Sequence, residues 1–221
     1  SANSISIARL LPQAVYYIYT YINLFEKLES INFVVPSGNL GNLTAGLITK
    51  FAGLPVNRFY ASLNQNDSFA KFLETGEYLP QPTIQTLSNA MDVGNPSNLE
   101  RIIALYKGNI NLMRRDISAK SYVNEETFKM IADTWNECHY LADPHTSVGL
   151  LYASELASKF RHEDFVVMST AHPAKFYEVV SSAAGIDFDI PQRLANCLNK
   201  PKLSKLIGTD YQEFKRLLLN P

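Results

Sequence analysis

The chain has 221 residues, of which 46% are hydrophobic and 19% are charged, and its formal net charge is −1. This composition predicts a globular protein with a sizeable core, and the balanced charge argues against a nucleic-acid-binding protein or a domain on an anionic membrane. No apolar run in the sequence approaches the ~20 residues of a membrane span. Cys138 and Cys197 lack the spacing of a metal site, which fits a reducing compartment and predicts the cytoplasm.

An amphipathic helix is predicted near the start, because apolar residues between Ile5 and Phe25 recur at steps of three and four. Pro12 should kink this helix or mark a fresh start, since proline removes one helical hydrogen bond. Arg9 lies near the helix start and could serve an anionic ligand, although a surface role is the usual one for a single arginine.

A strand–loop–helix unit follows and forms the centre of the predicted architecture. Residues 31–35 are an apolar run typical of a buried strand, and residues 43–51 have helical spacing. Gly38 and Gly41 in the loop between them allow a positive φ and a close backbone approach. Free N–H groups and the helix dipole there favour an anion, with phosphate the natural ligand. The spacing matches neither the P-loop nor the dinucleotide fingerprint, and an ordinary tight turn is the alternative.

A second strand is predicted at residues 56–62, which makes a parallel βαβ unit with a right-handed crossover. The polar residues Asn64, Gln65, Asn66 and Asp67 follow it directly. Ligands of open α/β sheets bind at the carboxyl ends of the strands, so this polar group is on the expected edge. Helix capping before Phe69 would explain the same residue types.

Residues 75–96 contain glycines and prolines without periodicity, which indicates a functional loop or lid. Ser97 is expected to cap the next helix, with Glu100 at the spacing of a capping box.

The second half is predicted to hold two amphipathic helices, one strand and a further helix. The helices occupy residues 121–138 and the segment opened by residues 143–146, and the strand lies at 165–168. The last helix has Pro173 at its first position and Gly185 as its C-terminal cap. His145 could be catalytic, but a histidine at a helix start is more often a hydrogen-bonded structural residue.

Thr170 follows the predicted strand and should therefore share the sheet edge of the Gly38 loop. Residues 1–190 are expected to form the α/β core. Residues 191–221 are expected to form a loop and a short helix, residues 210–219, packed on that core.

Two reaction classes are not supported by the motifs. The Gly-x-Ser-x-Gly pattern of serine hydrolases is absent, and the four histidines have no zinc spacing with one another or with the cysteines. The residues alone therefore predict a phosphorylated ligand and no metal site, and they leave the reaction open.

Five stretches, in the same order along the chain, resemble the threonine synthases, pyridoxal-phosphate enzymes of the bacterial and fungal class. They are residues 1–5 (SANSI), 36–41 (PSGNLG), 86–93 (TLSNAMDV), 143–146 (DPHT) and 170–176 (TAHPAKF).

The resemblance implies the fold type II architecture, an open twisted and mostly parallel sheet with helices on both faces, similar to the tryptophan synthase β subunit. It also implies a lyase of threonine biosynthesis that converts O-phosphohomoserine and water to threonine and phosphate with pyridoxal 5′-phosphate. The residues that it assigns to the cofactor's phosphate are Gly38, Asn39, Leu40, Gly41 and Asn42. Thr170 would bond the pyridine nitrogen, and Asn3, Ser4 and Arg9 would hold the substrate.

The family's Schiff-base lysine lies upstream of the matched region, so no catalytic residue is expected in this chain. Lys175 belongs to a family motif, but that motif's lysine is not the Schiff-base one. The chain is expected to be the C-terminal half of the enzyme, inactive alone, with the N-terminal half as its partner and a tendency to self-associate. The alternatives are a phospholigand-binding α/β domain without catalysis and another fold type II lyase, such as a dehydratase.

Overall fold

The computed structural model describes residues 6–24, 26, 31–198, 200–201 and 203–219. The chain divides into two compact units, Ser1–Phe188 and Asp189–Pro221, and each is described by itself.

The first unit is built on a four-stranded sheet of β1 (Ile31–Pro36), β2 (Val56–Leu63), β3 (Ile117–Ser121) and β4 (Phe165–Val167). The strand order is β3-β2-β1-β4, and all three pairs are parallel. Val34 in β1 pairs with Tyr60 on one side and with Val167 on the other. The predicted class, an open parallel α/β sheet, is confirmed.

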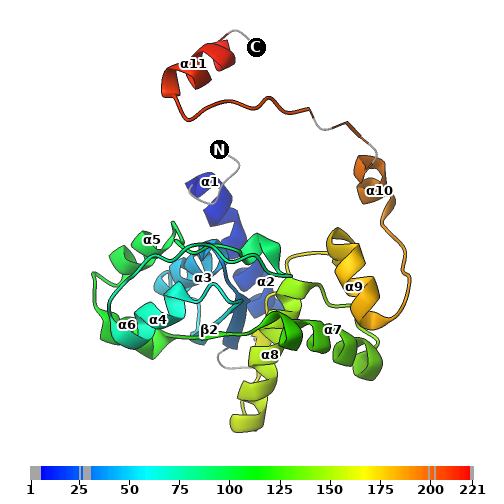
Figure 1. Cartoon of the computed structure of the whole chain (residues 1–221). Coiled ribbons are helices and arrows are strands. Elements are labelled where there is room, and N and C mark those ends of the chain that lie inside the picture. The colour runs from blue at the N-terminus through cyan, green and yellow to red at the C-terminus, as the bar shows by residue number, and fades with distance from the viewer. Residues whose placement is uncertain (1–5, 25, 27–30, 199, 202, 220–221) are drawn as a thin grey trace. The chain divides into compact units, whose positions relative to one another are not determined.

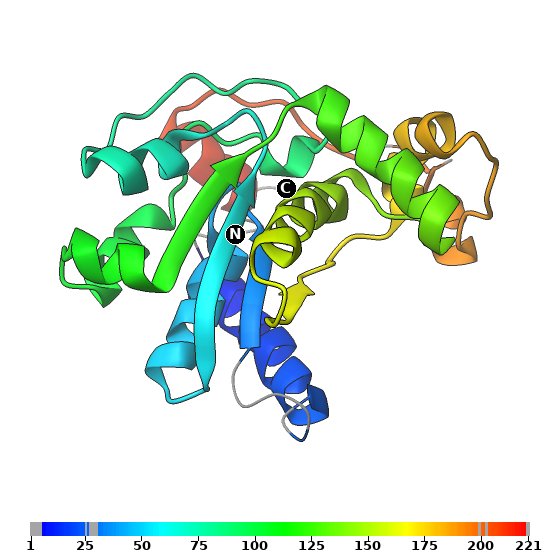
Figure 2. The same cartoon turned by 90° about the horizontal axis from the view of Figure 1, so that it is seen from below.

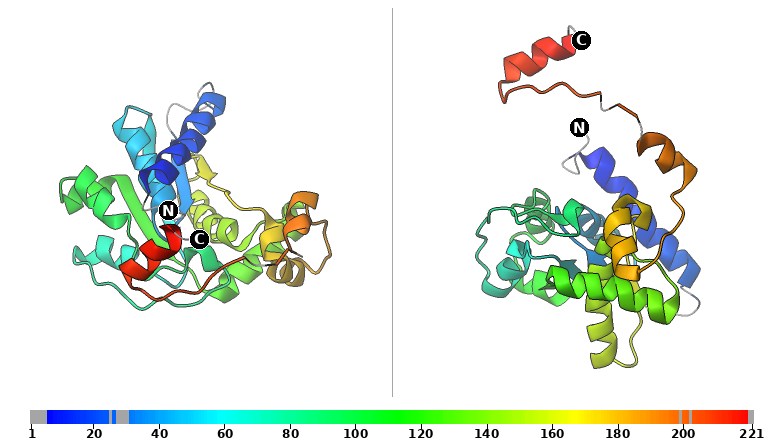
Figure 3. Two further views of the ribbon diagram at one scale, coloured as in Figure 1. Left: turned by 90° about the horizontal axis from the view of Figure 1, so that it is seen from above. Right: turned by 45° about the vertical axis from the view of Figure 1, so that its right-hand side comes forward.

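Helices cover this sheet and connect its strands (Figure 1). Before β3 they are α1 (Ile7–Leu10), η1 (Leu11–Gln13), α2 (Ala14–Leu24), α3 (Gly41–Phe51), α4 (Ser68–Thr75), η2 (Asn89–Met91), α5 (Leu99–Leu105) and α6 (Ile110–Asp116). After β3 they are α7 (Asn124–Cys138), α8 (Pro144–Lys159), η3 (Pro173–Phe176) and α9 (Tyr177–Ala184). Helix α7 packs beside both α8 and α9 (Figure 3).

Each face of the sheet has its own apolar layer, because the side chains of β1 alternate between the two faces. Phe33 points to the side of α2 and α3, where the Tyr17 ring meets it edge-on at 4.9 Å between centroids. Val34 belongs to the opposite layer with Val148 and Tyr152 of α8. Figure 2 shows α8 in front of the strands and α2 and α3 behind them. The burial of both faces holds the carboxyl ends of β1, β2 and β4 in register.

Several helix ends agree with the local sequence signals. Asp143 caps α8 by accepting the His145 backbone N–H at 2.9 Å, and Pro144 occupies the first turn. Gly185 ends α9 with a φ of +67°. Pro12 lies in the short 3₁₀ turn η1 between α1 and α2, so it marks the predicted interruption of the first helix.

Other predictions were wrong. Ser97 does not cap α5, whose N-cap is Asn98; the backbone N–H and Oγ of Ser97 instead donate to Asn39 Oδ1 at 2.6 and 2.9 Å. Strand β3 and helix α6 were not predicted. Ile117 is the strand's one large apolar residue, so its sequence lacks a strand pattern, and parallel pairing with β2 forms it.

The second unit contains α10 (Gln192–Leu198), where a loop was predicted, and α11 (Tyr211–Leu219), which was predicted. Its packing on the core stays a prediction. Among the described residues, no helix combines the length and apolarity needed to cross a membrane.

Candidate functional site

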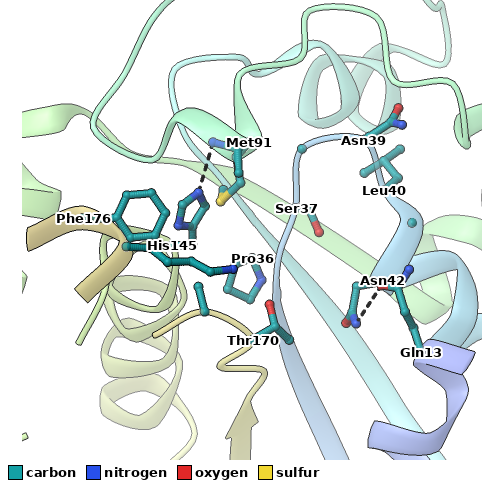
Figure 4. A pocket seen from close by; sticks show the side chains of 15 residues that line it. Gln13, Pro36, Ser37, Asn39, Leu40, Asn42, Met91, His145, Thr170 and Phe176 are labelled. Atoms are coloured by element: carbon teal, nitrogen blue, oxygen red, sulfur yellow. Dashed lines mark hydrogen bonds between the residues drawn. The ribbon is translucent and has the colours of Figure 1, made fainter. Parts of the chain in front are cut away.

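A cavity of about 380 Å³ opens at the carboxyl end of β1, beside the segment that follows β4 (Figure 4). It is lined by Gln13, Pro36, Ser37, Gly38, Asn39, Leu40, Gly41, Asn42, Ala90, Met91, His145, Thr170, Ala171, Lys175 and Phe176. The structure therefore brings the predicted loop and Thr170 together in one cavity, at the edge where open α/β sheets bind ligands.

The loop after β1 presents unpaired backbone donors. Within the described part of the chain, the N–H groups of Gly38, Leu40, Gly41 and Asn42 make no hydrogen bond to the protein. By contrast, the Ser37 N–H is paired with the Ser62 carbonyl at 2.9 Å. Protein backbone donors are almost always satisfied, so a group of unpaired ones at the start of α3 indicates a place for an acceptor. The helix dipole of α3 adds positive potential at that place.

The loop's backbone differs from the expectation at one point. The positive φ falls on Leu40, at +59°, and on neither glycine of the loop. A bulky residue in the left-handed region is strained and is found preferentially at functional sites. Gly38 is required for close packing instead, because a Cβ there would lie 2.5 Å from Met91 Cα.

The amide side chains of the loop are committed to the protein. Asn39 Oδ1 accepts from Ser97, and Asn42 Oδ1 accepts from the Tyr17 hydroxyl at 2.6 Å. Asn42 Nδ2 donates to Gln13 Oε1 at 3.2 Å, as Figure 4 shows. These side chains fix the loop to η1, to α2 and to the start of α5, while the loop itself lines the cavity.

Thr170 lines the same cavity and is exposed. Its hydroxyl makes no hydrogen bond to the protein within the described residues, so it remains available to a ligand.

His145 borders the cavity and is held on three sides. Its Nδ1 donates to Asp143 Oδ1 at 2.8 Å, and its Nε2 accepts the Ala90 backbone N–H at 3.2 Å. Its ring lies 4.7 Å from that of Phe176. Burial raises the pKa of the Asp143 carboxyl, but hydrogen bonds from His145 and Thr146 outweigh burial and hold that pKa below its ordinary value. These contacts favour the predicted structural role of His145, which fastens η2 to α8.

The polar residues after β2 neither face the cavity nor cap a helix through their side chains. Asn64 Nδ2 donates to Asp92 Oδ1 and to Thr86 Oγ1, both at 2.8 Å. Asn66 exchanges two hydrogen bonds with the backbone of Ile84. They pin the loop between α4 and α5, and Ala90 and Met91 of that loop form one wall of the cavity.

Of the three predicted substrate residues, the structure describes only Arg9. Asn3 and Ser4 lie outside the described residues. Arg9 is exposed on α1 and does not line the cavity. Sequence reasoning did not assign Lys175 and Phe176 to the site, although both fall in the TAHPAKF stretch that carried part of the resemblance. Among the described residues, no group of three or more His, Cys, Asp or Glu could hold a metal ion.

Comparison with known proteins shows that the chain is similar to the threonine synthases. The family model described as "Threonine synthase, C-terminal" matches residues 146–218. Threonine synthase from Escherichia coli is 38% identical over 221 residues, which are 100% of this chain and 51% of that protein. The Saccharomyces cerevisiae enzyme is 32% identical, with 83% of this chain and 44% of that protein covered.

Solved structures agree with the sequence matches. The crystal structure of E. coli threonine synthase superposes with a TM-score of 0.88 at 37% identity, covering 100% of this chain and 51% of that one. The PLP-bound threonine synthase from Brucella melitensis gives 0.83 at 28% identity, covering 98% and 52%. Threonine deaminase from Solanum lycopersicum, at 0.55 and 12% identity, with 79% and 49% covered, shares the fold alone. The chain spans about half the length of the curated relatives it matches, and by sequence and fold it corresponds to the C-terminal half of the threonine synthases.

Proposed function

We propose that this chain forms the cofactor-binding half of a threonine synthase, the lyase that converts O-phosphohomoserine and water to threonine and phosphate. One observation carries the proposal: four unpaired backbone N–H groups of the Gly38–Asn42 loop share a cavity with the free hydroxyl of Thr170. The threonine synthase from B. melitensis is described as PLP-bound, which supports the same cofactor here.

The residues present fit pyridoxal 5′-phosphate. Its phosphate requires several donors and positive potential, and the N–H groups of Gly38, Leu40, Gly41 and Asn42 at the start of α3 supply both. Its pyridine nitrogen requires one hydrogen-bond donor, and the Thr170 hydroxyl can supply it. The cavity volume of about 380 Å³ lies within the ordinary range for small-molecule sites.

When bound, the cofactor supplies an electron sink for the substrate's bonding electrons. The loop's donors would hold the phosphate without a proton transfer and would therefore act as a fixed anchor. The neutral hydroxyl of Thr170 would donate a hydrogen bond to the ring nitrogen without transferring its proton, because an alcohol is a much weaker acid than a pyridinium ion. The wall of Ala90 and Met91, held by His145, would bound the cofactor site on the side of η2.

The alternative of another fold type II lyase is disfavoured, because the threonine deaminase from Solanum lycopersicum is only 12% identical and shares the fold alone. The alternative of a non-catalytic phospholigand domain differs only in the absence of turnover, so an activity measurement separates it.

The cofactor assignment can be tested by titrating the chain with pyridoxine 5′-phosphate and with pyridoxine. Neither ligand has the aldehyde that labels surface lysines. The phosphate's charge-assisted hydrogen bonds should make the first ligand bind more than about tenfold more tightly. Equal affinities would contradict the phosphate cradle.

Catalysis can be tested by adding the part of E. coli threonine synthase that lies outside the match, expressed as a separate polypeptide. We expect phosphate release from O-phosphohomoserine by the mixture and none by either half alone. A stable complex that binds the cofactor but releases no phosphate would favour the non-catalytic alternative.

An apolar surface supports the partner assignment. Side chains on the outer faces of α1, η1 and α2 are 43–67% exposed: Ile7, Leu11, Val15, Tyr16, Ile18, Tyr19 and Ile22. Leu10 and Tyr17 on the inner face are fully buried, so these short helices are apolar on both sides. Contiguous exposed apolar surface marks an interaction site. We assign it to the half of the relatives outside the match, with self-association in that half's absence.

The partner surface can be tested by sedimentation of the chain and of the double variant Val15→Lys, Ile22→Lys. We expect the unmodified chain to self-associate and the variant to be monomeric and unable to bind the separate half. Unchanged association would exclude this surface. The location in the cytoplasm remains a proposal that rests on the two cysteines, both free and exposed.

A further inference from the structure

The charged side chain that lines the candidate cavity in the described structure is positive. Among the described residues that line it, none is Asp or Glu, and the one with a positively charged side chain is Lys175. The imidazole of His145 is engaged with Asp143 and with Ala90. The cation that sequence reasoning assigned to a substrate, Arg9, is not in the lining.

The ammonium of Lys175 is unpaired within the described structure. Four other lysines form ion pairs with carboxylates, at Lys50, Lys71, Lys120 and Lys129. Lys175 makes neither an ion pair nor a side-chain hydrogen bond among the described residues. A lysine that lines a polar cavity without a counter-charge is available to an anionic ligand.

The backbone on both sides of Lys175 is fixed. His172 Nδ1 accepts the Ala174 N–H at 3.1 Å, and Ala174 is 6% exposed. On the other side, Phe176 packs against the ring of His145, and Figure 4 shows both rings at the edge of the cavity. Because these neighbours are held, the lysine stem starts from a defined position at the cavity wall.

The cavity therefore has two separate groups that attract anions. The loop's N–H groups attract one oxyanion at the start of α3, and Lys175 attracts another from the segment after β4. If the proposed function holds, the cofactor's phosphate occupies the first place, and the second remains for the substrate.

We propose that Lys175 is a binding residue for an oxyanion of the substrate, its phosphate or its carboxylate, and so contributes to specificity for a phosphorylated amino acid. This inference rests on the proposed function for the identity of the substrate. The oxyanion subsite itself rests on the cavity's geometry and charge.

The test uses the 221-residue chain and its Lys175→Met, Lys175→Arg and Lys159→Met variants. Lys159 is an exposed lysine at the end of α8 and outside the candidate cavity, so its variant controls for the change in net charge. Calorimetric titrations with O-phosphohomoserine, homoserine and inorganic phosphate are made in saturating pyridoxine 5′-phosphate.

We expect Lys175→Met to lower the affinity for O-phosphohomoserine by about tenfold or more, which is the usual effect of losing one charge-assisted contact. Lys175→Arg should keep most of the affinity for O-phosphohomoserine, and Lys159→Met should match the unmodified chain. The affinity for pyridoxine 5′-phosphate should change less than about twofold in every variant, because neither lysine is among its proposed contacts. A matching loss with homoserine identifies the carboxylate as the partner, whereas a loss only with the phosphorylated ligands identifies the phosphate.

The subsite is overturned if Lys175→Met leaves all three affinities unchanged, or if the unmodified chain binds no anion beside pyridoxine 5′-phosphate. Failure of the proposed function gives a different result. In that case pyridoxine 5′-phosphate itself does not bind, and titration with inorganic phosphate alone still compares Lys175→Met with Lys159→Met.

Discussion

Two polar groups stand at neighbouring strand ends of the same sheet, and they differ in how their hydrogen bonds are used. After β1, four backbone donors of the Gly38–Asn42 loop have no partner in the described protein. After β2, the side chains of Asn64 and Asn66 are satisfied by Ile84, Thr86 and Asp92. The residue types suit a ligand in both places, but in the described protein the amides of Asn64 and Asn66 have protein partners, whereas the four backbone donors after β1 have none.

The satisfied group supports the unsatisfied one. Asn64 and Asp92 pin the loop that contains η2, and Ala90 of that loop donates to His145. Met91, next along, packs so closely on Gly38 that no side chain fits between them. The cluster after β2 thus fixes one wall of the cavity after β1. Rigid support of this kind keeps binding donors in place before a ligand arrives.

The largest effect is expected from Asp92→Ala, which removes the acceptor shared by Thr86 N–H, Thr86 Oγ1 and Asn64 Nδ2. Leaving these donors unpaired should cost about 3 kcal/mol in the free energy of unfolding, measured with urea. Asp133→Ala on α7, which loses only a surface ion pair with Lys129, is the control and should cost no more than about 0.5 kcal/mol. Similar losses of stability in the two variants would show that the hydrogen bonds of Asp92 stabilise the protein no more than an exposed ion pair does.

Gly38→Ala should come next, at about 2 kcal/mol, because the added Cβ forces Met91 backbone atoms to move. Phosphate normally stabilises a protein that binds it in the folded state, and this variant should lose that stabilisation, since the donors are displaced together. Thermal unfolding with and without phosphate measures both effects. A variant that retains the full phosphate-dependent shift would show that η2 and the loop are not coupled.

Asn42→Ala separates the role of the loop's side chains from the role of its backbone N–H groups. Its side chain bonds Tyr17 and Gln13, so we expect a loss of about 1 kcal/mol in stability. The affinity for pyridoxine 5′-phosphate should change less than about twofold, because the backbone N–H of residue 42 is retained. A tenfold loss of affinity at unchanged stability would instead assign the amide to the ligand.

Thr170→Val should have the smallest effect on stability, within about 0.5 kcal/mol, because the side chain is exposed and makes no hydrogen bond in the described protein. In the enzyme reconstituted with the separate half, turnover should fall more than cofactor affinity, since phosphate contacts carry most of that affinity. Thr170→Ser keeps the hydroxyl and should retain turnover. Equal turnover in Val and Ser variants would exclude a role for the hydroxyl.

Elements whose signals are local could be predicted from the sequence. Residues 31–51 form a strand, a loop and a helix because a buried apolar run, two glycines and helical spacing occur within one stretch. Asp143 and Gly185 mark helix ends for the same reason, since caps act over three or four residues. The sheet edge shared by Gly38 and Thr170 also followed, because parallel strands place their carboxyl ends together.

Which polar groups are free depends on contacts that form only in the folded chain. Ser97 bonds Asn39 rather than its own helix, and β3 forms because β2 offers it a ladder. Arg9 lies outside the cavity and Lys175 lines it, although both were cations near family motifs. The physical reason is that a hydrogen bond or an ion pair depends on partners distant in sequence. The sequence therefore specifies which groups can bind, and the folded structure determines which of them have no partner within the protein.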